Sequence, residues 1–272
     1  MIPATFDYER ASSAEEAVSL LQRHGDDAKL LAGGHSLIPL LRFRLATPAV
    51  LVDVGRLQEL SYVRDAGDHV AIGALTRHRD LEISDVARAE VPILAHVAGQ
   101  VGDPQVRHRG TIGGSIAHGD PASDLPAALL ALDGTLVARG PGGERQIPAT
   151  EFFRGFLETA LAPDELLTEI RVPKARGGWS FQKFNRRAQD WAIVGVAAVA
   201  NGATRVALVN MGPTPLRATG TEQALAGGAS VADAAARAAD GTEPSADLNA
   251  SVEYRRHLAT VLVRRALEEA RG

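Results

Sequence analysis

Two glycine pairs, Gly33-Gly34 and Gly113-Gly114, each lie in a stretch of small and polar residues. The first pair follows the mostly apolar run Ala28 to Leu31 and precedes a helix-like segment, Leu37 to Leu45. The second lies within Gly110 to Pro126, where few residues could serve a core. Glycine lets backbone approach a ligand closely, and consecutive amides in such turns form concave anion sites, usually for phosphate. The two turns together predict one ligand that carries two phosphates.

Each turn also has a simpler explanation. The first, Gly33 to Ser36, could be an ordinary strand-to-helix connection. The second is harder to explain in this way, because a long irregular segment in a compact domain usually has a function. Neither turn matches the Gly-x-Gly-x-x-Gly fingerprint or the Gly-x-x-x-x-Gly-Lys phosphate loop, so a Rossmann domain or an NTPase is unsupported.

Three histidines invite a metal or general-base interpretation. His35, His108 and His118 lie in unrelated turns without metal-ligand spacing, and the chain has no cysteine. We therefore expect exposed or backbone-bonded histidines and no metal site. We assign no catalytic acid, base or nucleophile to this chain.

Two acidic residues follow the second glycine pair. Asp120 and Asp124 could form a carboxylate pair, but a turn before Pro121 and a helix N-cap near Pro126 explain them locally. Asp124 could instead hold a hydroxyl group of a ligand.

Two short basic runs and a tryptophan complete the candidates. Arg107-His108-Arg109 and Lys183-x-x-Arg186-Arg187 are expected to be solvated, with contact to phosphate or an acidic partner as the alternative. Trp191 precedes an apolar strand, so we expect it in the core, although a stacking role stays open.

The elements that must position these residues alternate between helices and short strands, which is typical of an α+β domain. Ser13-x-x-Glu16 is a capping box, and Gly25 ends the helix that it opens. The further helices expected in the first part of the chain are Thr76–Ile83, Ile93–Val101 and Pro126–Leu132. The expected strands are Lys29–Leu31, Val50–Val54, Tyr62–Arg64, Val70–Ile72, Thr135–Ala138 and Arg145–Ile147.

The composition changes after Arg171 to Gly178, which we interpret as a linker. Beyond it, the sequence predicts three strands, Trp179–Asn185, Ala192–Ala200 and Arg205–Met211. Three helix-like segments follow, Thr221–Leu225, Ser230–Ala239 and Val252–Ala270. We therefore expect two domains, residues 1–175 and 176–272.

Composition excludes several classes of protein. The chain has 272 residues and a formal net charge of -4, which argues against a nucleic-acid surface. No apolar run reaches the length of a transmembrane helix, and Met1 to Arg10 lacks the pattern of a signal peptide. We therefore expect a cytoplasmic protein. The absence of cysteine excludes disulfides and an ordinary iron–sulfur cluster in this chain.

Three stretches, Lys29 to Leu37, Thr111 to Pro126 and Phe181 to Ala198, together resemble the FAD-binding medium subunit of molybdenum-containing hydroxylases. Within that family the chain most resembles the medium subunit of aerobic carbon monoxide dehydrogenase. The motifs Ala-Gly-Gly-His-Ser-Leu-Ile-Pro and Thr-Ile-Gly-Gly-Ser are specific to the group when they occur together, and the similarity runs along essentially the whole chain.

The resemblance implies a two-lobed α+β FAD-binding domain of the vanillyl-alcohol oxidase (PCMH) type. A small domain with a three-stranded antiparallel sheet and a helical bundle would follow it. It implies that Ala32 to Ser36 and Thr111 to Ser115 hold the pyrophosphate and that Asp124 bonds a polar part of FAD. The other cofactor-binding residues that it implies are Lys29, Leu30, Leu31, Leu37, Gly102, Gly110, Leu167, Lys183 and Trp191.

The chain departs from the family pattern at two of these positions. Relatives often have Asn where this chain has Ser115, which changes the hydrogen-bonding capacity slightly. They often have Tyr in place of Trp191, at which an aromatic ring lies against the isoalloxazine. Tryptophan can stack there but lacks the phenol hydroxyl.

The resemblance also implies the partners. FAD would receive electrons from a small [2Fe-2S] subunit and pass them to an external acceptor, such as a quinone, oxygen or NAD. The substrate would be oxidised on a large subunit that carries the molybdenum cofactor. The family assembly is a dimer of heterotrimers, cytoplasmic or peripheral at the inner face of the membrane. Two alternatives stay open, a stand-alone flavoprotein oxidase or reductase and a non-redox nucleotide-binding module.

Overall fold

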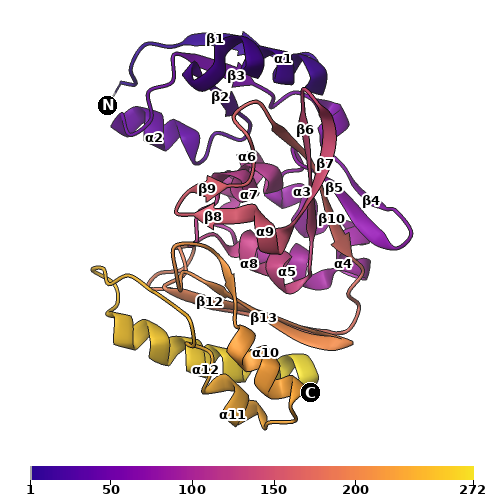
Figure 1. Ribbon diagram of the computed structural model, residues 1–272, viewed down its shortest axis with the longest axis vertical. Helices are drawn as coiled ribbons and strands as arrows, with labels where there is room; N and C mark the ends of the chain where they lie inside the picture. Colours follow the sequence, from indigo (N-terminus) through magenta and orange to yellow (C-terminus); the bar gives the residue numbers. More distant parts are fainter. Residues whose placement is uncertain (1) are drawn as a thin grey trace.

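The computed structural model describes residues 2–272 and shows three layers stacked along the long axis (Figure 1). A small N-terminal lobe lies at one end, a larger lobe in the middle and a sheet backed by helices at the other end. None of the helices in this described part is long and apolar enough to cross a membrane.

The first lobe is a three-stranded parallel sheet in the order β1-β3-β2, with two helices. Its elements are β1 (Asp7–Arg10), α1 (Ala14–His24), β2 (Ala28–Leu31), α2 (Leu37–Phe43) and β3 (Val50–Asp53). The Ser13 cap is confirmed at the start of α1, but the Glu16 side chain bonds the amide of Ser12 and not that of Ser13. The Glu16 amide donates to Ser13 Oγ at 3.1 Å, and the Glu16 carboxylate accepts from the Ser12 amide at 2.7 Å.

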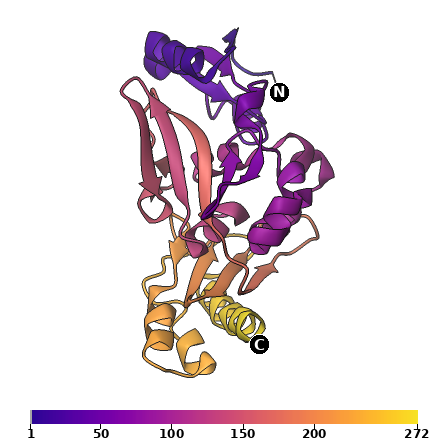
Figure 2. The same ribbon diagram turned by 90° about the vertical axis from the view of Figure 1, so that its right-hand side faces the viewer.

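The second lobe is a five-stranded antiparallel sheet, and helices cover one of its faces (Figure 2). Its strands, in spatial order, are β4 (Val63–Asp65), β5 (His69–Gly73), β10 (Leu166–Pro173), β6 (Thr135–Gly140) and β7 (Gly143–Pro148). Its helices are α3 (His78–Ile83), α4 (Asp85–Glu90), α5 (Pro92–Gln100), α6 (Pro104–Arg109), α7 (Ile112–His118), α8 (Asp124–Ala131) and α9 (Ala149–Phe152). A small hairpin, β8 (Phe153–Gly155) and β9 (Glu158–Thr159), leads back to β10.

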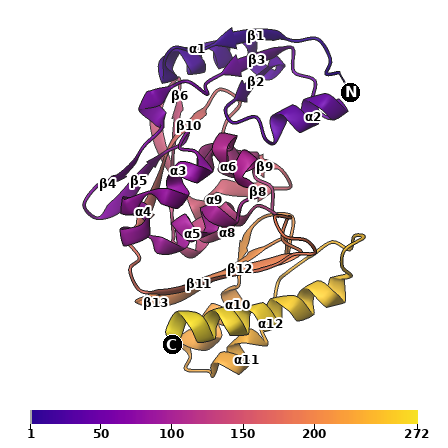
Figure 3. The same ribbon diagram turned by 180° about the vertical axis from the view of Figure 1, so that it is seen from behind.

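The C-terminal part is an antiparallel sheet with helices on its outer face (Figure 3). Its elements are β11 (Gly178–Phe184), β12 (Val194–Asn201), β13 (Ala203–Val209), β14 (Leu216–Arg217), α10 (Thr219–Ala226), α11 (Val231–Ala235) and α12 (Val252–Arg271).

This sheet is buried on both faces. Along β12, Val196 and Ala198 pack with residues of α12, whereas Ala197 and Val199 join the core of the second lobe. Successive side chains of a strand point to opposite faces, so a strand covered on both sides is apolar at nearly every position. The C-terminal sheet is therefore packed between α8 and α12.

The expected α+β class is confirmed, and the structure adds elements that were not expected, namely β1, α4, α6, α9, β8, β9 and most of β10. Four of the expectations need correction. The second glycine stretch is not irregular, because Ile112–His118 forms α7. The expected linker begins too early, since Arg171 to Pro173 belong to β10. The three expected strands gain a two-residue fourth strand, β14, and α11 ends at Ala235 rather than Ala239.

Candidate functional site

The first glycine turn connects β2 to α2 and presents free backbone donors. The amides of Gly33, Gly34, His35 and Ser36 donate no hydrogen bond to any other group within residues 2–272. Gly34 has a φ of 80°, and a Cβ there would lie 2.6 Å from Ile38 Cδ1. Only glycine adopts this conformation without strain. Consecutive free amides of this kind form an anion site.

The second glycine turn uses most of its amides internally. The Ile112 amide donates to the Thr76 carbonyl at 3.0 Å, and the Gly113 amide donates to the Ala74 carbonyl at 2.8 Å. Thr111 caps α7 by accepting from the Gly114 amide at 3.1 Å. A Cβ on Gly113 would lie 2.5 Å from Ala74, so this glycine allows a close approach of two backbone segments. The first turn is therefore the richer source of donors for a phosphate.

The two turns meet. A Cβ on Gly33 would lie 2.4 Å from the Arg109 carbonyl oxygen and 2.9 Å from Gly110 Cα. The Arg77 guanidinium donates to the same Arg109 carbonyl and, at 3.4 Å, to the Gly55 carbonyl. Arg77 thus ties the second turn to the first lobe. One extended ligand can contact both turns because they are separated only by backbone van der Waals distance.

A buried histidine lies behind this junction. His78 is 4% exposed, and its amide donates to the Gly110 carbonyl at 3.0 Å. Burial is the main cause that lowers the pKa of His78 to about 4, so the ring is neutral near pH 7. Its Nδ1 atom has no partner within the described residues. Sequence reasoning missed both Arg77 and His78, since neither belongs to a motif.

A buried ion pair lies where α8 meets β11. Lys183 Nζ is 2.6 Å from Asp124 Oδ2 and donates to the Gln100 carbonyl at 3.0 Å. Both charged side chains are less than 10% exposed. Burial raises the pKa of Asp124 to about 6, although the Lys183 ammonium acts in the opposite direction. Asp124 Oδ1 is buried and finds no partner among residues 2–272.

This pair corrects two local interpretations. Asp124 does not cap a helix, because Ser123 occupies the N-cap position of α8 and Asp124 is its first residue. Lys183 is not on a solvated face, whereas the Arg187 side chain is 79% exposed, as expected. The turn predicted for Asp120 is confirmed, since its carboxylate accepts from the Ala122 amide at 2.8 Å.

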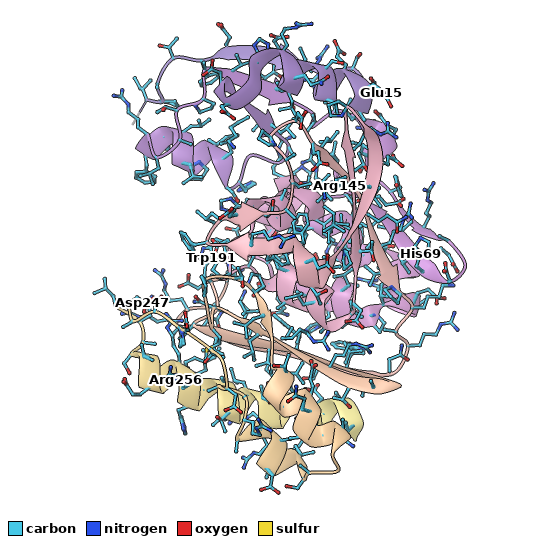
Figure 4. All side chains as sticks on the ribbon, viewed as in Figure 1. Glu15, His69, Arg145, Trp191, Asp247 and Arg256 are labelled. Carbon is cyan, nitrogen blue, oxygen red and sulfur yellow. The ribbon has the colours of Figure 1, made fainter. Side chains whose placement is uncertain are left out.

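The other residues predicted to bind the cofactor lie on several different elements. Leu167 is buried in β10, in the same core as the apolar residues of α7. Trp191 is 57% exposed, so the expectation that it lies in the core is wrong (Figure 4). Gly102 lies after α5 with a φ of 50°. Lys29 is exposed, whereas Leu30, Leu31, Ala32, Leu37 and Ser115 are half-buried.

The three candidate histidines do not gather. His35 and His108 are exposed and His118 is half-buried. No group of three or more histidine or acidic side chains in the described part of the chain could hold a metal ion.

The geometry fits a ligand that carries phosphates and hydroxyls. The first turn offers free amides for an anion, and the unpartnered Oδ1 of Asp124 can accept a hydrogen bond from a hydroxyl. A buried polar atom without a partner calls for an explanation, and a hydroxyl group of a bound ligand would supply one. These features fit a dinucleotide such as FAD.

Comparison with known protein families matches both parts of the chain. Residues 4–175 match the model described as the FAD binding domain in molybdopterin dehydrogenase. Residues 179–270 match the CO dehydrogenase flavoprotein C-terminal domain.

Individual relatives are similar over their full length. The carbon monoxide dehydrogenase medium chain of Hydrogenophaga pseudoflava is 45% identical and covers 99% of this chain and 98% of its own. The 6-hydroxypseudooxynicotine dehydrogenase complex subunit alpha of Paenarthrobacter nicotinovorans is 39% identical, over 99% and 96%.

Solved structures agree. A structure of carbon monoxide dehydrogenase from Hydrogenophaga pseudoflava superposes with a TM-score of 0.96, at 45% identity over 99% of this chain and 98% of that one. Quinoline 2-oxidoreductase from Pseudomonas putida 86 superposes with a TM-score of 0.92, at 32% identity over 100% and 99%. The resemblance seen in the sequence is confirmed. The chain belongs to the family of FAD-binding medium subunits of molybdenum hydroxylase complexes, oxidoreductases in which FAD passes electrons from an iron–sulfur subunit onward.

Proposed function

We propose that FAD binds with its diphosphate on the free amides of the first glycine turn and extends past the second turn towards Asp124, Lys183 and Trp191. The observation that carries this proposal is the run of unused amides from Gly33 to Ser36, pressed against Gly110 of the second turn. The residues proposed to line the cofactor are Lys29, Leu30, Leu31, Ala32, Gly33, Gly34, His35, Ser36, Leu37, Gly102, Gly110, Thr111, Ile112, Gly113, Gly114, Ser115, Asp124, Leu167, Lys183 and Trp191.

FAD supplies the redox chemistry when bound, and the chain supplies binding, orientation and electrostatics. Lys183 holds the Asp124 carboxylate through Oδ2, so Asp124 Oδ1 would be left to accept a hydrogen bond from a cofactor hydroxyl. The exposed Trp191 would offer its ring to the flavin and would shield it from water. The binding domain spans residues 1–175, and residues 176–272 contribute Lys183 and Trp191.

The names of the relatives support a proposal for the assembly. Several of them are medium chains or subunits of dehydrogenase complexes. We place this chain between a small [2Fe-2S] subunit, which delivers electrons one at a time, and an external acceptor. A large subunit carries the molybdenum cofactor, and two such heterotrimers associate in the cytoplasm. Because the chain has no cysteine, the iron–sulfur cluster belongs to a separate subunit.

Absorbance spectroscopy of the purified chain and of the co-expressed complex tests the proposal. Flavin bands near roughly 370 and 450 nm, which bleach with dithionite, are expected with one FAD per chain. Iron that co-purifies on a cysteine-rich subunit is expected alongside. A complex that contains iron but no flavin, even after incubation with excess FAD, would overturn the proposed function.

A further inference from the structure

Arg77 is a half-buried cation at the junction of the two glycine turns. Its Nη1 donates to the Arg109 carbonyl, which is the oxygen that a Cβ on Gly33 would meet, and its Nη2 donates to the Gly55 carbonyl at 3.4 Å. A Cβ on Gly55 would lie 3.1 Å from the Ala32 carbonyl oxygen, so Gly55 lies against the start of the first turn. The guanidinium is therefore close to the free amides that begin at Gly33, yet the proposed function gives it no role.

The Arg77 side chain has more hydrogen-bond donors than it uses. A guanidinium carries five N–H groups in a planar fork, and Arg77 commits two of them to the two carbonyls, which leaves three free. The Nε atom donates to no group within residues 2–272, and it is not sealed inside the protein. A ligand at the junction can therefore accept hydrogen bonds from Arg77 while its two backbone bonds stay in place.

The charge of Arg77 is not compensated by the surrounding chain. Arg79 and Arg107 both pair with Glu82, at 3.1 and 3.2 Å, whereas Arg77 and Arg109 form no ion pair within residues 2–272. Burial, and then the charge of Arg109, lower the pKa of Arg77, although an arginine stays protonated near pH 7. Two neighbouring cations without a counter-ion are unfavourable, because like charges repel and the half-buried one has lost part of its solvation.

The carboxylates that act on Arg77 do so from beyond ion-pair distance. Asp80 is exposed, and both it and Asp53 favour the charged form of Arg77 only weakly compared with burial. Asp53 is already engaged, since its Oδ1 accepts from the Gly55 amide at 2.7 Å and its Oδ2 accepts from the Tyr8 hydroxyl at 2.5 Å. The counter-ion that this junction lacks is therefore an anionic ligand.

We infer that Arg77 is the counter-charge of the cofactor diphosphate and that its fork sets the spacing between the two glycine turns. This inference rests on the proposed function. The free donors and the charge of Arg77 act on a phosphate oxygen, with the planar geometry that suits guanidinium and phosphate. Its two bonds to carbonyls hold Gly55 of the first lobe and Arg109 of the second lobe at a fixed separation. The binding of FAD should then depend on salt, because ions screen a charge that is not fully buried.

Fluorescence titration of the flavin-free, co-expressed complex with FAD at two salt concentrations tests the inference. Arg77→Gln keeps a side-chain donor but removes the charge, whereas Arg77→Lys keeps the charge but removes the fork. Arg77→Gln is expected to weaken FAD binding at least about tenfold at about 50 mM salt, and less than about threefold at about 500 mM, where the charge is screened. Arg77→Lys is expected to bind FAD within about threefold of wild type and to keep the salt dependence of wild type.

Arg79→Gln is the matched control, because it removes the same charge from the same helix at an exposed position that pairs with Glu82. It is expected to leave FAD binding unchanged at both salt concentrations. Equal losses in Arg77→Gln and Arg77→Lys that do not change with salt would indicate a purely structural role and would overturn the inference. Wild-type binding that is insensitive to salt would overturn it as well. Failure of the wild-type complex to take up any FAD would instead count against the proposed function.

Discussion

The first glycine turn depends on the backbone conformation of a single residue, Gly34. Its positive φ turns the chain so that the amides from Gly33 to Ser36 remain unbonded. Gly113 serves a different purpose, because it lets α7 approach the backbone of Ala74. The two glycine pairs therefore look alike in the sequence but have different roles: the first leaves amides unbonded, and the second allows close backbone packing.

Replacing Gly34 by Ala is expected to remove most of the FAD binding, because a Cβ at φ 80° both strains the turn and meets Ile38. Gly67→Ala is the matched control. Gly67 also has a positive φ, of 95°, but a Cβ there meets nothing within 4 Å, in the hairpin between β4 and β5. Fluorescence titration with FAD should show a loss of at least about tenfold for Gly34→Ala only. Equal losses in the two variants would contradict the account.

His78 is expected to make stability depend on pH. The pKa of His78 is lowered to about 4, so the folded chain resists protonation that the unfolded chain accepts below about 6.5. Protonation of His78 therefore favours the unfolded chain. The free energy of unfolding is highest near pH 7 and decreases as the pH falls from about 6.5 towards 4. Chemical denaturation should show that wild type loses about 2 kcal/mol more than His78→Gln between about pH 7 and pH 5. Parallel losses would show that His78 is not buried as a neutral ring.

At the scale of elements, the sequence predicted the strands and helices that carry strong local signals. The Ser13 cap of α1 and the hairpins that contain β5 and β6 are examples. It missed α7, because Gly113 and Gly114 have low helix propensity and the helix is set by the Thr111 cap and by bonds to Ala74.

β10 was missed for a related reason. Its last residues, Arg171 to Pro173, were assigned to the linker, and its Leu166 to Ile170 stretch was not predicted as a strand. Glu169 in this stretch is buried and accepts from the Tyr62 hydroxyl at 2.5 Å. A hydrogen bond between side chains so far apart along the chain cannot be predicted from a single sequence. The same holds for the ion pair of Asp124 and Lys183, whose partners lie on separate domains.

That ion pair is expected to fasten α8 to β11. Lys183→Met leaves the Asp124 carboxylate buried without a counter-charge, which costs about 3 to 5 kcal/mol of the free energy of unfolding. Adding Asp124→Leu should recover much of this loss, since the unpaired charge is then removed. Arg187→Met, at an exposed position, should change the stability by less than about 1 kcal/mol. The measurement is urea denaturation of the FAD-free chain, and a double variant no better than Lys183→Met would contradict the pairing.

At the scale of the whole molecule, the C-terminal sheet lies between the second lobe and α12, so the two domains should unfold together. Ala197 is fully buried in the core that the sheet shares with the second lobe. Ala197→Asp should therefore lower the temperature of one common transition in calorimetry, because it buries an unpaired charge. Two separate transitions, only one of which shifts, would contradict a shared core.

A crystal or cryo-EM structure of the FAD-loaded complex tests the proposed cofactor site most directly. We expect the diphosphate oxygens to lie about 3 Å from the amide nitrogens of the first glycine turn, between Gly33 and Ser36. We also expect a cofactor hydroxyl to donate to Asp124 Oδ1. A diphosphate held elsewhere, with the amides of Gly33 to Ser36 still unbonded, would contradict it.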